Sequence, residues 1–123
     1  MGFRTRTLIG LALCAASCLA TTGARAQTVI INELHYHPGD GGSSGEFVEL
    51  HNYGSRDVDI SGWLLSGAIT YVFPQGSVME AGGFLVIAAN ADLLAIRYDL
   101  PRDSLQGDFS GNLDNAGELL QLW

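Results

Sequence analysis

The sequence predicts an all-β sandwich with one short helix. Three observations support this fold class: roughly six short segments rich in β-branched and apolar residues, turns of Gly, Pro or Asn about every ten residues, and a single helical segment. A layered α/β fold would need helices that alternate regularly with the strands. The chain does not contain such a pattern, so a parallel α/β fold is excluded.

The first two strands are predicted on either side of a glycine-rich loop. Residues 28–36 (TVIINELHY) are mostly apolar or β-branched, and residues 39–45 are Gly, Ser and Asp. Residues 46–52 alternate with a period of two, which places Val48 and Leu50 on one face and the intervening side chains on the other. One face of this second strand is therefore expected in the core.

The later strands follow at similar spacing. Residues 84–89 (FLVIAA) are apolar on both faces, which predicts a buried central strand. A helix is predicted from Asn90, an N-cap residue, to about Tyr98, and Pro101 prevents its continuation. The chain after the helix is expected to be mostly loop before its last strand. The remaining predicted strands span residues 60–65, 68–73, 78–80 and 117–123.

Residues 1–26 predict a secretory signal peptide. Arg4 and Arg6 precede the apolar run 8–20, and residues 24–26 (Ala-Arg-Ala) form a signal-peptidase site. The run is shorter than the roughly 20 residues that span a bilayer, so an integral membrane protein is not expected. The mature domain would then comprise residues 27–123, exported to the periplasm, the cell surface or the medium. Lipid attachment at Cys18 is the alternative to cleavage after Ala26.

Removal of the signal would leave an acidic domain without cysteine. Three arginines and all 13 acidic residues would remain, a formal net charge of 3 − 13 = −10, and the sequence contains no lysine. Nucleic-acid binding depends on Lys and Arg, so that function class is excluded, whereas calcium or a cationic partner is compatible with the charge. Both cysteines, Cys14 and Cys18, lie within the signal, so stability must come from a packed core.

The ordered set of segments resembles the lamin tail domain, a family of immunoglobulin-like sandwiches found in nuclear lamins and in exported bacterial proteins. No single segment is specific, but their order along nearly the whole mature chain is. The resemblance implies an immunoglobulin-like topology for the predicted sandwich. The matching segments are VIINEL (29–34), GEFVELHNYGS (45–55), SGW (61–63), YVFP (71–74), AGG (81–83) with the FLVIA that follows, and SGNLDNAGELLQL (110–122).

The resemblance also implies an irregularity in the first strand. Ile31 and Leu34 both match core positions, although residues three apart lie on opposite faces of a regular strand. A β-bulge near Asn32 and Glu33 reconciles the two. Beyond that bulge, the side chains of His35 and His37 are expected to point outward.

A further strand normally follows the last matched segment in this family. The sequence here stops at Trp123, so we expect the chain to be the front part of a longer protein; otherwise the sandwich would keep an open edge. Exported members often accompany a larger domain, such as a spore-coat-type kinase-like domain, a nuclease or a phosphatase. The activity of such a parent protein would then lie downstream.

Two pairs of side chains are the candidate metal ligands. His35 and His37 share a strand face, as do Glu49 and His51 on the next strand, and imidazole suits a transition metal. The pairs would meet only if the two strands adopt the right register, which the sequence does not determine. A solvated strand face is the alternative interpretation, and it is the one adopted for all four residues.

Acidic residues in the turns are the other candidates. Three acidic pairs place oxygen atoms in loops, but none reproduces a calcium-binding motif. Turn-forming aspartates that accept backbone hydrogen bonds are the preferred interpretation, with a weak calcium site as the alternative. Glu33 is predicted near the core in a structural role, and Ser43 and Ser44 lack the pattern of a nucleophile elbow. The pairs are Asp57 with Asp59, Asp40 with Glu46, and Asp108 with Asp114.

The aromatic residues are interpreted as core. Trp63, Tyr71 and Phe73 could stack on a sugar, but their strand positions favour packing inside a small domain. Trp123 falls on the polar side of its strand, or at a place that another segment covers.

The sequence therefore predicts a non-catalytic, exported module for interaction or spacing, with a protein or cell-envelope partner and no cofactor. Its binding surface would be a set of loops or a strand edge. The alternatives are the front part of a hydrolase or kinase-like enzyme, and a calcium- or metal-dependent adhesion domain.

Overall fold

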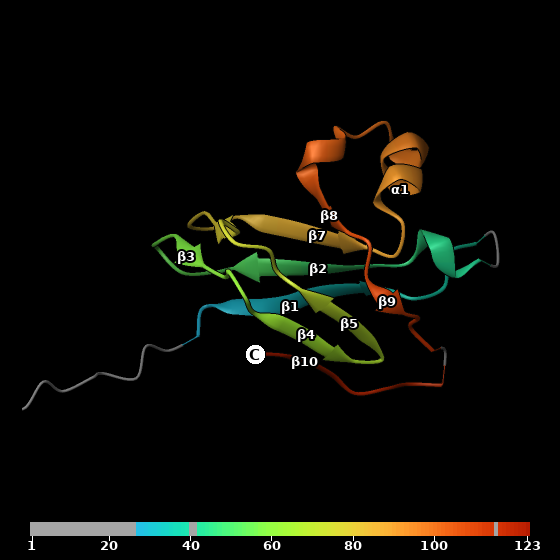
Figure 1. Ribbon diagram of the computed structural model, residues 1–123, viewed down its shortest axis with the longest axis horizontal. Helices are drawn as coiled ribbons and strands as arrows, with labels where there is room; N and C mark the ends of the chain where they lie inside the picture. Colours follow the sequence, from blue (N-terminus) through green and yellow to red (C-terminus); the bar gives the residue numbers. More distant parts are fainter. Residues whose placement is uncertain (1–26, 40–41, 115) are drawn as a thin grey trace, which may run out of the picture.

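The computed structural model describes residues 27–39, 42–114 and 116–123, and these form a β-sandwich with one short helix (Figure 1). The first sheet has the order β1-β2-β7-β8 and the second the order β10-β4-β5-β9. A separate two-stranded ribbon pairs β3 with β6. The predicted signal peptide, with Cys14 and Cys18, and Asp40 lie outside the described residues.

The first sheet consists of β1 (Val29–His35), β2 (Phe47–Asn52), β7 (Phe84–Ala88) and β8 (Leu105–Gly107). The strands β1, β2 and β7 are antiparallel, and β8 runs parallel to β7. The register of β1 against β2 shifts between Ile31 and Glu33, so the predicted bulge is confirmed. A shift of this kind moves the side chains that follow to the opposite face.

The second sheet consists of β4 (Leu64–Gly67), β5 (Ile69–Val72), β9 (Ser110–Gly111) and β10 (Leu120–Leu122). The ribbon joins β3 (Val58–Asp59) to β6 (Val78–Met79). Gly67 ends β4 with a φ of 119°, and a Cβ at this position would collide with the carbonyl oxygen of Leu119. Only glycine therefore permits β10 to pack this closely on the hairpin of β4 and β5.

The core lies between the two sheets. Val48 and Leu50 of β2 are fully buried, as their alternation predicts. They pack with the other buried side chains of both sheets, and Trp63 and Tyr71 are partly buried against the same cluster. The other members are Val29, Ile60, Leu65, Ile69, Phe73, Met79, Ile87, Phe109 and Leu113. The interpretation of Trp63, Tyr71 and Phe73 as core residues is confirmed.

A second, smaller cluster lies under the helix α1 (Ala91–Tyr98). Ala91, Leu94 and Ala95 face Ala88 and Leu105, with Phe47 and Val86 partly buried beside them. The side chain of Asn90 accepts a hydrogen bond from the amide of Leu93 at 2.9 Å, which confirms the predicted N-cap. The helix ends at Tyr98, ahead of Pro101.

Three expectations about the strands and loops were wrong. Leu34 is 44% exposed and is not a core residue, since it lies beyond the bulge near the end of an edge strand. Strand β7 is central, but its first residue, Phe84, is 58% exposed because the helix covers only the other end of that face. The segment after the helix is not simply loop, because it forms η2 (Arg102–Ser104), β8 and β9.

Candidate functional site

The four candidate metal ligands lie on or just beyond the outer face of β1 and β2. His35 is paired with Phe47 and His51 with Ile30, while Glu49 is opposite Glu33. The outward orientation predicted for the first histidine is confirmed, because its ring stacks on that of Phe47. His37 follows the end of β1 and is exposed.

The three candidates on the strands, His35, Glu49 and His51, each have a partner on this face. The ring of His51 stacks on Phe84 with centroids 4.2 Å apart and an interplanar angle of 5°, and His35 stacks on Phe47 at 4.8 Å. Oε1 of Glu49 accepts a hydrogen bond of 2.7 Å from the side-chain amide of Asn32. Two histidines are therefore separated along the strands, each packed against a phenylalanine.

Within the described ranges, no three His, Cys, Asp or Glu side chains lie close enough to hold a metal ion together. The register of β1 and β2 explains this arrangement, because it places His35 opposite Phe47 instead of opposite Glu49 or His51. The solvated strand face adopted for these four residues stays a prediction, and solution measurements can test the metal-binding alternative.

Aspartates in the turns accept hydrogen bonds from backbone amides. Asp59 binds the amide of Ser61 at 2.9 Å, and Asp114 binds the amide of Ala116 at the same distance. Asp57 reaches further along the chain, to the amide of Ala81 at 2.9 Å. The hydroxyl and amide of Ser61 hold the pKa of Asp59 below its usual value. These carboxylates fix turns, as the sequence predicts.

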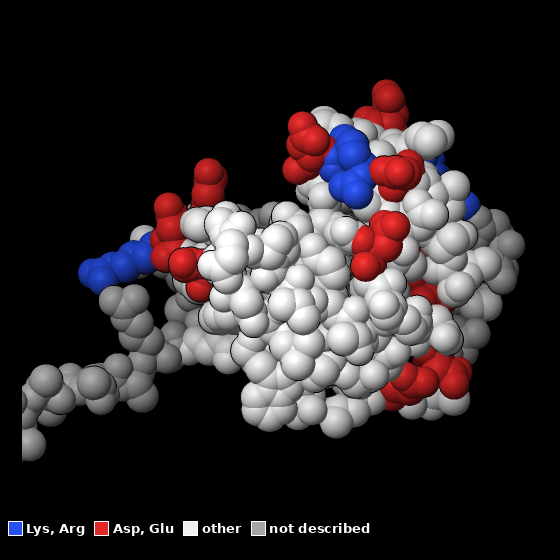
Figure 2. Space-filling view, viewed as in Figure 1, with Lys and Arg blue, Asp and Glu red and all other residues white. Residues whose placement is uncertain are grey.

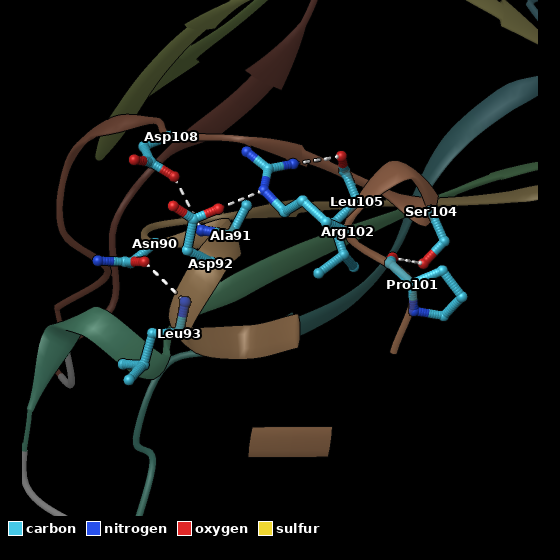
Figure 3. A network of polar contacts seen from close by, with 9 residues as sticks. All are labelled: Asn90, Ala91, Asp92, Leu93, Pro101, Arg102, Ser104, Leu105 and Asp108. Carbon is cyan, nitrogen blue, oxygen red and sulfur yellow. Dashed lines mark hydrogen bonds and ion pairs between the residues drawn. The ribbon is translucent and has the colours of Figure 1, made fainter. Parts of the chain in front are cut away.

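Asp108 belongs to a polar network that holds the helix (Figure 3). Its Oδ1 accepts a hydrogen bond of 2.8 Å from the amide of Ala91, at the first turn of α1. Arg102 joins the helix to the following segment, with Nε 2.6 Å from Oδ1 of Asp92 and a terminal nitrogen 3.1 Å from the carbonyl oxygen of Leu105. The network therefore positions the helix against β8, and both ion-pair partners remain largely exposed.

The buried acid of this fold is Glu46, not Glu33. Glu33 is exposed, because the bulge turns it away from the core, so the prediction that it lies near the core was wrong. Glu46 is 4% exposed, and its Oε2 accepts a hydrogen bond of 2.8 Å from the amide of Leu113. The preceding residues Ser43 and Ser44 lie in a short 3-10 turn, η1 (Ser43–Gly45).

Asn52 is a second buried polar residue, which the sequence did not single out. Its side-chain nitrogen donates to the carbonyl oxygens of Arg56, Met79 and Glu80 at 2.8, 3.2 and 3.0 Å. Its side-chain oxygen accepts from the hydroxyl of Thr28 and the amide of Gly54. One asparagine thus joins the first sheet to the loops around the ribbon. Its burial could have been inferred from its position at the end of a strand in which alternate residues are buried.

The aromatic residues divide between the core and the surface. The rings of Tyr71 and Phe73 meet edge to face, 5.1 Å apart, and the Tyr71 hydroxyl donates to the side chain of Gln106 at 2.8 Å. Burial raises the pKa of the Tyr71 phenol. Trp123, in contrast, is 66% exposed, and its indole nitrogen donates to the hydroxyl of Ser66 at 3.1 Å.

No helix in the described part of the chain is long and apolar enough to cross a membrane. The family model described as Lamin Tail Domain matches residues 22–122, which is most of the chain. The match confirms the resemblance that the ordered segments indicated and the immunoglobulin-like sandwich that it implied. No curated protein matches the chain significantly.

Proposed function

Because this chain belongs to the lamin tail domain family, we propose that it is an exported interaction module without catalytic activity of its own. The partner is a protein of the cell envelope or of the surrounding medium. Such a module works by presenting a rigid surface, and in small domains that surface usually lies on loops and strand edges.

The observation that carries this proposal is the structural use of polar side chains in the loops and at the ends of strands. Asn52, Glu46 and Asp108 each bind backbone groups of distant segments. Such bonds make loops rigid, since buried backbone groups must stay paired. Rigid loops preserve the shape of a surface, which reduces the conformational entropy lost on binding.

Exposed apolar side chains provide additional support. Ile30 and Phe84 flank His51 on the outer face of the first sheet, and all three side chains belong to neighbouring strands. Trp123 provides a second exposed apolar surface on the other sheet. Aromatic residues at exposed positions are enriched at the centres of protein interfaces.

Photo-crosslinking on intact producing cells tests the proposal. A photoreactive phenylalanine analogue is placed at Phe84, at Trp123 or, as a control, at Gln75, which is exposed in a turn. We expect a discrete crosslinked species from at least one of the first two positions and none from the control. Cell fractionation should place the protein outside the cytoplasm. Retention in the cytoplasm, or no discrete product from either test position, would contradict the proposal.

The alternative function is that of a hydrolase or kinase-like enzyme that carries this module beside its catalytic domain. Reading the gene past the codon for Trp123 tests this alternative. A stop codon directly after Trp123 in well-determined sequence would contradict it, while the interaction module would be unaffected.

A further inference from the structure

One end of the sandwich carries a groove of about 670 Å³ to which no role has yet been assigned. Figure 1 places β3, the start of β1 and the end of β10 around this end of the molecule. The groove thus combines segments from the beginning, middle and end of the described chain. The lining residues that matter for its chemistry are Gln27, Arg56, Asp57, Asp59, Trp63 and Trp123.

Two tryptophans form the aromatic part of the groove. Trp63 packs partly against the core, and its backbone is held by bonds to Ile60 and Phe73 at 3.0 and 2.9 Å. Trp123 exchanges two backbone hydrogen bonds with Leu64, at 3.0 and 3.2 Å, and its indole is bound to Ser66. Fixed indole rings of this kind bind flat or cationic groups, with Trp the strongest cation–π partner among the side chains.

Two carboxylates lie in the same groove. Asp57 and Asp59 each use Oδ1 to accept a backbone hydrogen bond, from Ala81 and Ser61 respectively. Hydrogen bonds from the hydroxyl and the amide of Ser61 lower the pKa of Asp59, and an aspartate is ionised at neutral pH in any case. The structure therefore holds two carboxylates in a groove that both tryptophans also line, and neither aspartate forms an ion pair among the described residues.

Figure 2 shows acidic side chains gathered at the end of the molecule where Figure 1 draws β3, with a basic side chain beside them. The whole chain has a formal charge of −7 and no lysine. A field of this sign attracts cations and repels anions before contact, so charge complementarity favours a basic ligand.

We infer that this groove, lined by Trp63 and Trp123 and by Asp57 and Asp59, binds an arginine or lysine side chain of the partner protein. This inference rests on the proposed interaction function and adds the chemistry of the partner segment. Arg56 is the single basic residue among the described lining residues, and it reduces the attraction for a cation. Replacement of Arg56 by a neutral residue therefore distinguishes binding of a cationic ligand from binding of an anionic one.

The two tryptophans are the only ones in the sequence, so intrinsic tryptophan fluorescence reports on this groove alone. The probe is the peptide acetyl-Gly-Arg-Gly-Arg-Gly-amide. The control peptide carries citrulline, which has nearly the shape of arginine without its charge. We expect a saturable change in emission with the arginine peptide that weakens as salt rises, and no comparable change with the citrulline peptide.

Substitutions in the full chain then identify the groups involved. Asp57→Asn with Asp59→Asn keeps both Oδ1 acceptors but removes the charges, and we expect binding about fivefold weaker or more. Asp114→Asn is the matched control, because Asp114 makes the same kind of turn bond, and it should leave binding unchanged. Arg56→Gln should strengthen binding by about twofold. Equal thermal midpoints establish that the variants fold alike.

Three results would overturn the inference: equal binding of the citrulline peptide, weaker binding by the Arg56→Gln protein, or an emission change with a disaccharide of N-acetylglucosamine but not with arginine. The last result would assign the groove to a neutral sugar. If these results occur while crosslinks still form at Phe84, the groove inference fails and the interaction module stands. Absence of crosslinks at both Phe84 and Trp123 would reject the module itself.

Discussion

The buried carboxylate of Glu46 accepts a hydrogen bond from the amide of Leu113, 67 residues away in sequence, at 2.8 Å. This bond fastens the segment before β10 to the start of β2. Replacement of Glu46 by Ala leaves a buried amide without a partner, which costs about 2 kcal/mol of unfolding free energy. Replacement by Gln keeps an acceptor and should cost less than half as much. Urea unfolding of both proteins measures the difference, and equal losses would show that the bond to Leu113 is unimportant.

Asn52 is expected to be the most sensitive polar position. Asn52→Asp removes the donor to three carbonyl oxygens and adds a buried charge, so we expect a loss of about 3 kcal/mol at neutral pH. The deficit should shrink as the pH falls, because burial raises the pKa of the new carboxyl in the folded protein and protonation restores a donor. Gln75→Glu, the same chemical change at an exposed turn, is the control. A deficit independent of pH would contradict this account.

A buried and an exposed phenylalanine together test the assignment of the core. Phe73→Ala should lower the unfolding free energy by about 3 to 5 kcal/mol, because the fully enclosed ring leaves a cavity. Phe84→Ala should cost less than about 1.5 kcal/mol, because this ring is largely exposed and packs mainly on His51. Chemical denaturation of both variants gives the comparison. Similar costs would mean that another segment covers Phe84 in solution.

Thermal unfolding tests the metal and calcium interpretations together. We expect the same midpoint with calcium, with zinc and with a chelator, since the two histidines on the strands stack on phenylalanines and the turn aspartates bind amides. A ligand at 100 times its dissociation constant would stabilise the folded protein by about 2.7 kcal/mol. A zinc-dependent rise that His35→Gln abolishes would establish the metal site.

The predicted export and signal cleavage determine the expected mass and thiol content of the secreted protein. The secreted protein should begin at Gln27, and its residues 27–123 should contain no thiol, because Cys14 and Cys18 lie in the predicted signal peptide. Mass spectrometry and titration with a thiol reagent measure both properties. Retention of Met1 would contradict cleavage, whereas a lipid mass on Cys18 would select the lipoprotein alternative.

Much of the fold could be predicted from local patterns. The alternation around Val48 and Leu50 predicts their burial, and Asn90 predicts the start of the helix. Both features depend on side chains within a few residues of one another. The bulge in β1 was implied by the family resemblance instead. The parallel strand β8 has no comparable pattern, since its three residues become a strand only by pairing with β7.

The candidate site was less predictable for the same reason. Histidines two residues apart share a face, but only the register across β1 and β2 determines what lies opposite them. Glu46 looks like any acid after a glycine-rich loop, and its burial depends on a partner far along the chain. Leu34 looks like a core residue, yet the edge of the sheet leaves it exposed.

The sequence by itself determined the class of fold, the acidic charge and the ends of the helix, because composition and short-range periodicity control these properties. The family resemblance came from the order of the matching segments. The tertiary structure decided which polar groups are buried, which histidines meet phenylalanines and that Trp63 and Trp123 line one groove. Those outcomes depend on strand register and on contacts between distant segments. A one-residue change of register reverses every side chain of a strand, so no local pattern can determine them.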